Sequence, residues 1–188
     1  MSRLQKRVVE LVEQRGLRRF EEPVALASGE LSREFVDGKA ALAHGADLQT
    51  ACDAMLEAVS SFEFDAVGGL TMGADQFAHV IAVLARVDWF VVRKAPKGRG
   101  TNQLIEGAVL GSGVRVLLVD DVVTTGGSIE RAWEAIRETG ADVVAVVTLV
   151  DRGDVARELF AERGVPYFPL VTYTDLGIPP VGRAPVGA

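Results

Sequence analysis

Two adjacent acids follow an apolar run near the middle of the chain. Residues 116–119 read Val-Leu-Leu-Val, and Asp120 and Asp121 come directly after them. Four apolar residues are typical of a strand covered on both faces, and open α/β sheets bind ligands at the carboxyl ends of such strands. The two carboxylates are therefore predicted to lie in a ligand site, where they can accept hydrogen bonds from sugar hydroxyls.

A loop of small residues follows the acids. Residues 122–128 read Val-Val-Thr-Thr-Gly-Gly-Ser, and a helix is predicted to begin near Ser128. The loop offers side-chain hydroxyls, backbone N–H groups that the glycines allow to approach a ligand closely, and the positive end of a helix. Together these features suit one phosphate group. The loop lacks a Walker lysine and the dinucleotide glycine spacing, so ATP and NAD sites are not indicated. A plain capped helix is the alternative, and the combination of acid pair and loop disfavours it.

A sheet must position these residues. Strands and helices alternate along most of the chain, which predicts an α/β fold with a mostly parallel sheet flanked by helices. The predicted strands are 24–26, 34–36, 66–70, 89–92, 105–110, 116–119, 143–150 and 167–172, and the predicted helices are 2–16, 47–59, 74–84, 128–138 and 155–163.

Composition limits the kind of protein. The 188 residues are 48% hydrophobic and 24% charged, which suits a single domain, predicted over 1–176. Three prolines within 177–188 predict a flexible C-terminal tail. The net charge of −6 argues against a nucleic-acid partner, and no apolar stretch approaches the roughly 20 residues of a membrane span. The single cysteine, Cys52, fits a reducing cytoplasm.

A basic, glycine-rich segment lies between two of the predicted strands. It contains Arg93, Lys94, Lys97 and Arg99, and Pro96 excludes a regular helix or a central strand. An exposed, mobile loop is expected there. The alternative is a solvated basic turn without a function.

Residues 116–128 resemble the signature with which the phosphoribosyltransferase family binds phosphoribosyl pyrophosphate (PRPP). Further segments resemble the orotate phosphoribosyltransferase family in order and spacing, so that the resemblance extends from about Val24 to Leu176. These segments are Leu26-Ala27-Ser28-Gly29 with Phe35-Val36-Asp37, residues 68–75, residues 92–107 and Asp151-Arg152. The resemblance implies a type I phosphoribosyltransferase fold with a small N-terminal hood, mainly 17–38, and a catalytic lid over 93–104. In relatives the lid closes over the neighbouring subunit's active site, which implies a homodimer.

The resemblance also implies how PRPP is bound. Asp120 and Asp121 are expected to hold the ribose 2′ and 3′ hydroxyls, and the loop after them the 5′-phosphate. Lys97, Arg99 and Asp121 are the expected catalytic residues, the two cations stabilising the departing pyrophosphate. Mg²⁺ is expected as a cofactor bound mainly through the diphosphate and water, with no metal ligands supplied by the protein. The expected PRPP-binding residues are Thr71, Arg93, Lys94, Asp120, Asp121, Val122, Val123, Thr124, Thr125, Gly126, Gly127 and Ser128.

The base-binding side is expected to centre on Arg152. Its guanidinium carries a fork of donors that suits a carboxylate or an imide. Thr125, Ser28 and Phe35 are the other expected orotate-binding residues. The alternative for Arg152 is an ion pair with a surface acid, either Asp151 or Asp154.

The implied reaction is transfer of the 5-phosphoribosyl group from PRPP to orotate. It gives orotidine 5′-monophosphate and pyrophosphate, a step of pyrimidine nucleotide biosynthesis. Four positions depart from the family pattern: Ala27, Glu34, Gly73 and Arg99. Because the first two lie on the acceptor side, a transferase for another nitrogenous base is one alternative. A non-catalytic PRPP-binding regulator is the other.

Overall fold

The structure is a computed structural model that describes residues 1–26, 29–95 and 104–182. Its centre is a six-stranded sheet with the strand order β5-β4-β3-β6-β7-β8. Neighbouring strands are parallel except β4 and β5, which are antiparallel. The mostly parallel α/β fold predicted from the sequence is thus confirmed. The strands are β3 (Ala66–Leu70), β4 (Asp88–Val92), β5 (Ile105–Gly107), β6 (Arg115–Val123), β7 (Asp142–Asp151) and β8 (Tyr167–Thr172).

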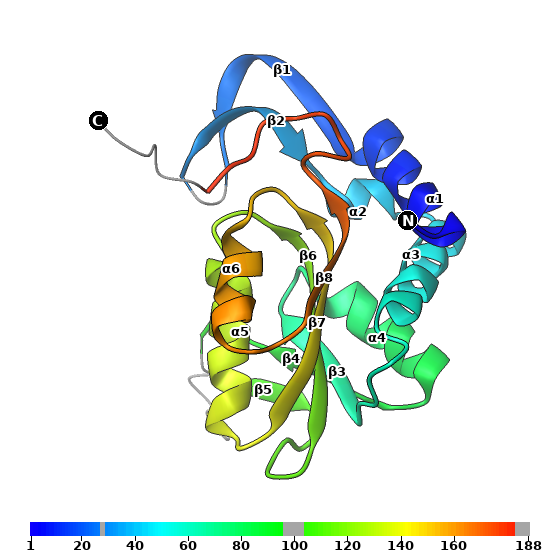
Figure 1. The fold of residues 1–188 in the computed structure, drawn as a ribbon, viewed down its shortest axis with the longest axis vertical. Helices are drawn as coiled ribbons and strands as arrows, with labels where there is room; N and C mark the ends of the chain where they lie inside the picture. The colour runs from blue at the N-terminus through cyan, green and yellow to red at the C-terminus, as the bar shows by residue number, and fades with distance from the viewer. Residues whose placement is uncertain (27–28, 96–103, 183–188) are drawn as a thin grey trace.

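Helices cover both faces of this sheet (Figure 1). The helices α1, α3 and α4 lie on one side, and α5 and α6 lie on the other. Each predicted helix is present, with ends that differ by a few residues from the prediction. The bounds are α1 (Arg3–Leu11), continued by the π-helical turn η1 (Val12–Gly16), α3 (Gly45–Ala58), α4 (Asp75–Ala85), α5 (Gly127–Glu138) and α6 (Val155–Glu162).

The apolar run before the acid pair lies in β6 and joins the two halves of the core. Leu117 and Val119 pack in the cluster beneath α1, α3 and α4, whereas Val116 and Leu118 pack in the cluster beneath α5. All four are fully buried. A strand that faces helices on both sides needs apolar residues at successive positions rather than at alternate ones. This placement brings Asp120 and Asp121 to the strand's carboxyl end.

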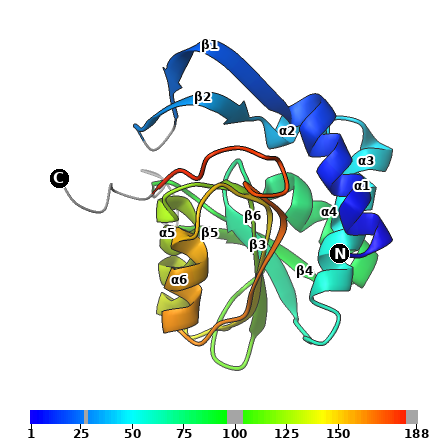
Figure 2. The same cartoon turned by 45° about the horizontal axis from the view of Figure 1, so that its top comes forward.

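The N-terminal part of the chain forms a separate two-stranded hairpin over that end of the sheet (Figure 2). The strands β1 (Leu17–Ala25) and β2 (Leu31–Val36) are antiparallel, with an irregular register between Arg19 and Val24. The short helix α2 (Gly38–Ala41) follows them and is capped by Asp37, which accepts a hydrogen bond from the backbone N–H of Ala40 at 3.0 Å. The hairpin is longer than the sequence pattern predicts.

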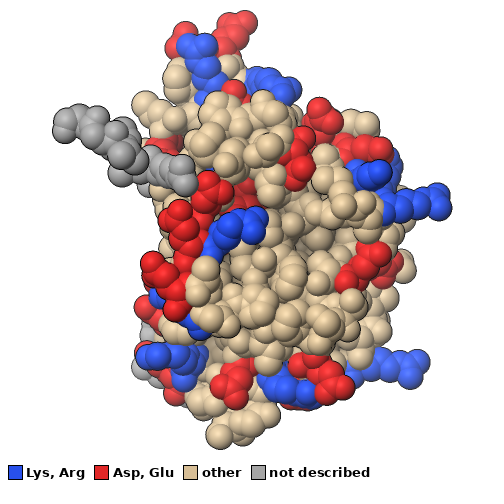
Figure 3. All heavy atoms as spheres, viewed as in Figure 1, with Lys and Arg blue, Asp and Glu red and all other residues tan. Residues whose placement is uncertain are grey.

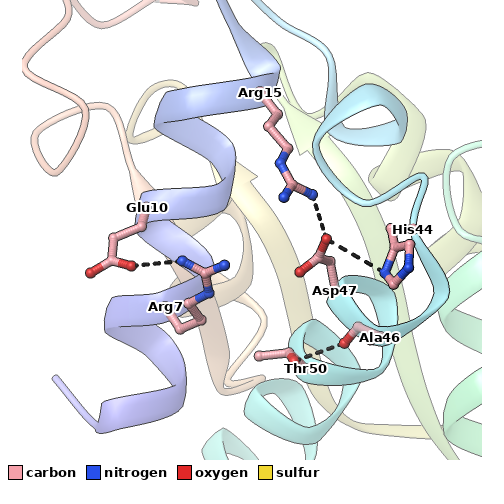
Figure 4. Close-up of polar contacts among 7 residues, drawn as sticks. All are labelled: Arg7, Glu10, Arg15, His44, Ala46, Asp47 and Thr50. Atoms are coloured by element: carbon pink, nitrogen blue, oxygen red, sulfur yellow. Dashed lines mark hydrogen bonds and ion pairs between the residues drawn. The ribbon is translucent and has the colours of Figure 1, made fainter.

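The base of the hairpin is fixed to the helical layer (Figure 4). Arg15, which lies two residues before β1, forms an ion pair with Asp47 in the first turn of α3. An acidic side chain is favourable in the first turn of a helix, because the helix dipole is positive there. His44 Nδ1 lies 3.9 Å from the same carboxylate. These contacts connect the segment before β1 to α3.

The C-terminal segment differs from the flexible tail predicted over 177–188. Ile178 and Val181 are only 7% and 9% exposed. The backbone N–H of Val181 donates to the carbonyl of Arg152 at 2.8 Å, and that of Gly182 donates to Glu30 Oε2 at 2.8 Å. The segment runs beside the hairpin in both ribbon views (Figures 1 and 2). Its apolar side chains and two backbone hydrogen bonds hold it up to residue 182, and residues 183–188 lie outside the described residues.

Charged side chains of both signs are intermixed on the face shown in Figure 3. Among the described residues, no helix has the length and apolar character that crossing a membrane requires. Cys52 is buried in α3, and burial raises the pKa of its thiol to about 12, helped by Asp53. A thiol with so high a pKa is unreactive at neutral pH.

Candidate active site

A pocket of about 800 Å³ lies between the hairpin and the carboxyl ends of β3, β4, β6 and β7. This volume is in the range of sites that bind small molecules. Ten of the predicted site residues line it: Phe35, Thr71, Arg93, Lys94, Asp120, Asp121, Val122, Thr124, Ser128 and Arg152. Three others, Ser28, Lys97 and Arg99, lie outside the described residues. The structure therefore gathers side chains from distant parts of the sequence around one space.

The acid pair is held by backbone hydrogen bonds. The N–H of Asp121 donates to Asp120 Oδ1 at 2.9 Å, and the N–H of Val122 donates to Asp121 Oδ1 at 2.7 Å. Lys39 Nζ donates to Asp121 Oδ2 at 2.7 Å. Both carboxylates therefore have a defined orientation before any ligand binds, which reduces the cost of ordering them around a sugar.

Burial changes the charge state of Asp120. Burial, together with the charge of Asp121, raises the pKa of Asp120 to about 7, although the N–H of Asp121 and the charges of Lys39 and Lys94 act to lower it. Burial lowers the pKa of Lys39, but the hydrogen bond and charge of Asp121 outweigh it, so this pKa lies above 10.5. Asp120 therefore gains or loses its proton near neutral pH.

Replacing Asp120 by asparagine should stabilise the ligand-free protein at high pH. Because the pKa of this acid is raised on folding, from 3.8 to about 7, its contribution to stability falls as the pH rises from 4 to 7 and then stays constant. Removing the charge should raise the free energy of unfolding by about 2 kcal/mol at pH 8. Denaturant titrations at pH 8 and pH 5 should show a smaller gain at pH 5. An equal gain in the free energy of unfolding at both pH values would contradict the raised pKa of Asp120. A similar gain in the surface variant Asp142→Asn would contradict it as well.

The loop after β6 has the conformation that a phosphate-binding turn requires. Gly126 has a φ of 78°, a left-handed conformation that glycine adopts without strain, and it caps α5, which begins at Gly127. The helix N-terminus thus directs its N–H groups toward the loop. Thr124 and Ser128 line the pocket. Val123, Thr125, Gly126 and Gly127 are not among its lining residues, and the side chain of Val123 is buried in the core.

Arg152 enters the pocket from the end of β7. Its backbone N–H donates to the carbonyl of Val123 at 2.8 Å, which places Arg152 beside the loop that follows β6. The residue is 1% exposed, and its Nη1 donates to the carbonyl of Glu34 at 3.1 Å. Among the described residues its Nε and Nη2 have no hydrogen-bond partner. The guanidinium makes no ion pair with Asp151 or Asp154, so the alternative of a surface ion pair is not what the structure shows.

A buried cation with two unused donors is costly without a ligand. Burial lowers the pKa of Arg152, and the charge of Glu34 opposes this effect. The side chain of Glu34 accepts a hydrogen bond from Ser32 Oγ at 3.2 Å and is not among the residues that line the pocket. Phe35 lines it instead and is 37% exposed. An anionic group is therefore the ligand that this corner of the pocket suits.

The two ends of the basic loop are anchored. Arg93 pairs with Glu106 at 3.0 Å, and its backbone N–H donates to the carbonyl of Leu104 at 2.8 Å. Arg131 of α5 donates to the carbonyl of Lys94 at 2.9 Å. On the opposite side Thr71 Oγ1 donates to Asp75 Oδ2 at 2.8 Å. Of the described parts of the loop, Arg93, Lys94 and Ala95 line the pocket.

Two residues of the pocket, Gly38 and Lys39, lie outside every motif singled out in the sequence. They line it from the hairpin side together with Asp37, and Met72 and Gly73 line it from the loop after β3. Asp37, Met72 and Gly73 belong to segments that carry the family resemblance but were not among the predicted site residues. Asp37-Gly38-Lys39 follows the second hairpin strand directly, and a small residue between an acid and a cation at that point was the available signal.

The described part of the pocket contains carboxylate oxygens that could bind a divalent cation, but too few of them to complete its coordination shell. Among the described residues no group of three or more His, Cys, Asp or Glu side chains is placed to hold a metal ion. The carboxylates of Asp120 and Asp121 are suitable ligands for Mg²⁺, which commonly takes one or two carboxylates and completes its shell with phosphate oxygens and water. The residues therefore fit Mg²⁺ that arrives with a phosphorylated ligand.

Comparison with known proteins agrees with a site for a phosphorylated ligand. Residues 39–161 match the family model described as phosphoribosyl transferase domain. The chain is 41% identical over 177 residues to the orotate phosphoribosyltransferase of Aquifex aeolicus, covering 91% of this chain and 96% of that protein.

Solved structures are similar over nearly the whole chain. Crystal structures of Mycobacterium tuberculosis orotate phosphoribosyltransferase resemble it with a TM-score of 0.79 for the Fe(III) dicitrate complex and 0.75 for the PRPP complex. Both are 34% identical to it and cover 93% of this chain and 99% of theirs.

Proposed function

The chain belongs to the orotate phosphoribosyltransferase family, and we propose that it transfers the 5-phosphoribosyl group from PRPP to N1 of orotate. The products are orotidine 5′-monophosphate and pyrophosphate. The enzyme is a pentosyltransferase of pyrimidine nucleotide biosynthesis. The observation that supports this acceptor most directly is Arg152, a buried guanidinium in the pocket with two nitrogens that have no partner among the described residues.

The donor binds along the end of β6. Asp120 and Asp121 accept hydrogen bonds from the ribose hydroxyls, and the loop from Val122 to Ser128 holds the 5′-phosphate. Thr71, Arg93 and Lys94 face the diphosphate. Mg²⁺, when bound through the diphosphate, neutralises part of its charge. Holding the sugar at both ends makes the attack of the base effectively intramolecular.

Orotate binds on the side of β7 and the hairpin. Its carboxylate accepts hydrogen bonds from the two free nitrogens of Arg152, while Phe35, Thr125 and Ser28 complete the site. The departure at Glu34 does not disfavour this acceptor, because its side chain is bonded to Ser32 and is not among the residues lining the pocket. Bond cleavage at the anomeric carbon gives the sugar oxocarbenium character and gives the leaving diphosphate negative charge.

The lid residues Lys97 and Arg99 stabilise that charge. We further propose a homodimer in which the lid of one subunit covers the site of the other. Exposed apolar side chains on α4 and β4, Val83 at 78% and Trp89 at 43%, support a self-contact that includes β4, the strand that precedes the lid. A cytoplasmic enzyme is consistent with the buried free thiol of Cys52.

Replacing Lys97 by alanine should lower the turnover number about 100-fold, because one donor to the developing charge is lost. The affinity for PRPP should change little.

Mixing Lys97→Ala with Asp121→Asn should restore about a quarter of the wild-type activity. Half of the dimers are then mixed, and each mixed dimer contains one intact site out of two. Initial rates before and after mixing measure both effects. Undiminished turnover in Lys97→Ala removes its catalytic role, and failure of the mixture to recover activity excludes the shared lid.

The reaction itself is tested with PRPP, Mg²⁺ and a panel of bases. Pyrophosphate release and the loss of orotate absorbance should occur with orotate and not with adenine, hypoxanthine or uracil. Release with another base would reassign the acceptor. Binding of PRPP without release of pyrophosphate with any base would indicate a PRPP-binding regulator.

A further inference from the structure

A lysine outside the predicted site residues contacts the acid pair. Lys39 Nζ donates to Asp121 Oδ2 at 2.7 Å, across 82 positions of sequence. The side chain of Lys39 is 53% exposed and that of Asp121 is 16% exposed. An ion pair this exposed contributes little to folding stability. Since both residues line the pocket, the contact is better explained by ligand binding.

The position of Lys39 is determined by packed backbone. A Cβ on Gly38 would lie 3.1 Å from Leu149 Cδ2 and 3.6 Å from Asp121 Cβ, so the backbone of α2 lies directly against the ends of β6 and β7. Asp37 caps α2 from the other side. The lysine therefore starts from a fixed point next to the acids.

The loop after β3 has no room for a cation at this place. A Cβ on Gly73 would lie 2.6 Å from Asp120 Oδ1 and 2.7 Å from Asp121 Oδ1. Any side chain there would displace the carboxylates from the N–H groups that orient them. A positive charge on the acid pair must therefore come from another element, and α2 supplies it.

The chemistry of the donor requires such a charge. Two carboxylates that bind ribose hydroxyls stand close to the phosphate and the diphosphate of the same molecule, and like charges at short range repel one another. An ammonium group on Asp121 offsets one negative charge without occupying Asp120. It also holds the carboxylate of Asp121 in place while the sugar enters.

We propose that Lys39 is a positioning residue for PRPP, which orients Asp121 and remains beside the bound ribose as its counter-charge. This inference rests on the proposed function, because it assigns a residue to the donor half of that reaction. It predicts that replacing Lys39 weakens the binding of PRPP and leaves the binding of orotate unchanged, since the orotate side of the pocket is formed by Arg152 and the hairpin.

The test compares Lys39→Met, Lys39→Arg and the matched surface variant Lys6→Met. Calorimetry with PRPP and Mg²⁺ should show about tenfold weaker binding in Lys39→Met, the range expected when a hydrogen bond to a charged group is lost. The KM for orotate should stay within about twofold, Lys39→Arg should recover most of the affinity, and Lys6→Met should match the wild type.

Wild-type affinity for PRPP in Lys39→Met would overturn the inference and leave the proposed function intact. A second pattern would also overturn the inference: Lys39→Met loses affinity for PRPP and for orotate equally, its melting temperature falls, and Lys39→Arg recovers neither affinity. That pattern indicates a purely structural role for Lys39. A wild-type protein that binds no PRPP would overturn both the inference and the proposed function.

Discussion

Replacing Arg152 by methionine should reduce kcat/KM for orotate about 1,000-fold, as expected when one partner of a buried charge pair is removed. The guanidinium is 1% exposed and has two nitrogens without a partner among the described residues, and this is the basis on which we propose that it binds the acceptor's anionic group. Affinity for PRPP should stay within about threefold. Initial-rate kinetics with each substrate varied in turn give both values.

The same variant should not be less stable than the wild type. In the ligand-free protein the charge of Arg152 is buried without a hydrogen-bonded carboxylate among the described residues, and exchanging such a buried charge for an apolar side chain is neutral or stabilising. Thermal unfolding should show this, and orotate should raise the melting temperature of the wild type but not that of Arg152→Met. Arg137→Met, which changes an arginine packed on Trp133 away from the pocket, is the control. Unchanged use of orotate in Arg152→Met would remove the proposed base-recognition role.

Replacing Gly73 by valine should weaken PRPP binding by on the order of 1,000-fold, because the hydrogen bonds that both carboxylates accept from the ribose hydroxyls are lost. The Cβ alone would approach Asp120 Oδ1 to 2.6 Å and Asp121 Oδ1 to 2.7 Å. Both oxygens accept backbone N–H groups, so they cannot move away without breaking those bonds. Calorimetry with PRPP and Mg²⁺ measures the loss.

Two further variants separate this effect from general damage to the fold. Gly73→Ala should show an intermediate loss, because it adds the Cβ without the branched methyl groups. Gly111→Ala should behave as the wild type, since no atom lies within 4 Å of a Cβ placed there. Normal PRPP affinity in Gly73→Val, with an unchanged melting temperature, would show that the acid pair does not hold the ribose.

Local patterns in the sequence were sufficient to predict the central part of the site. Residues 116–119 lie in β6 and are buried on both faces, the two acids end at the pocket, and α5 begins within one residue of the predicted start. The reason is that these signals are short-range: an apolar run identifies a strand buried on both faces, and a glycine that can adopt a positive φ identifies the turn into the helix. The alternation of strands and helices likewise predicted a mostly parallel sheet.

Only the tertiary structure decided which distant residues lie together around the acids and over the sheet. Lys39 contacts Asp121 across 82 positions, Arg152 contacts Glu34 across 118, and Gly182 contacts Glu30 across 152. The prolines of the C-terminal segment predicted flexibility, yet burial of Ile178 and Val181 orders it. No local pattern encodes such contacts, because they depend on how the hairpin and the chain end fold back over the sheet. The sequence therefore determined the chemistry at the end of β6, and the packing of remote segments determined the charges that surround it.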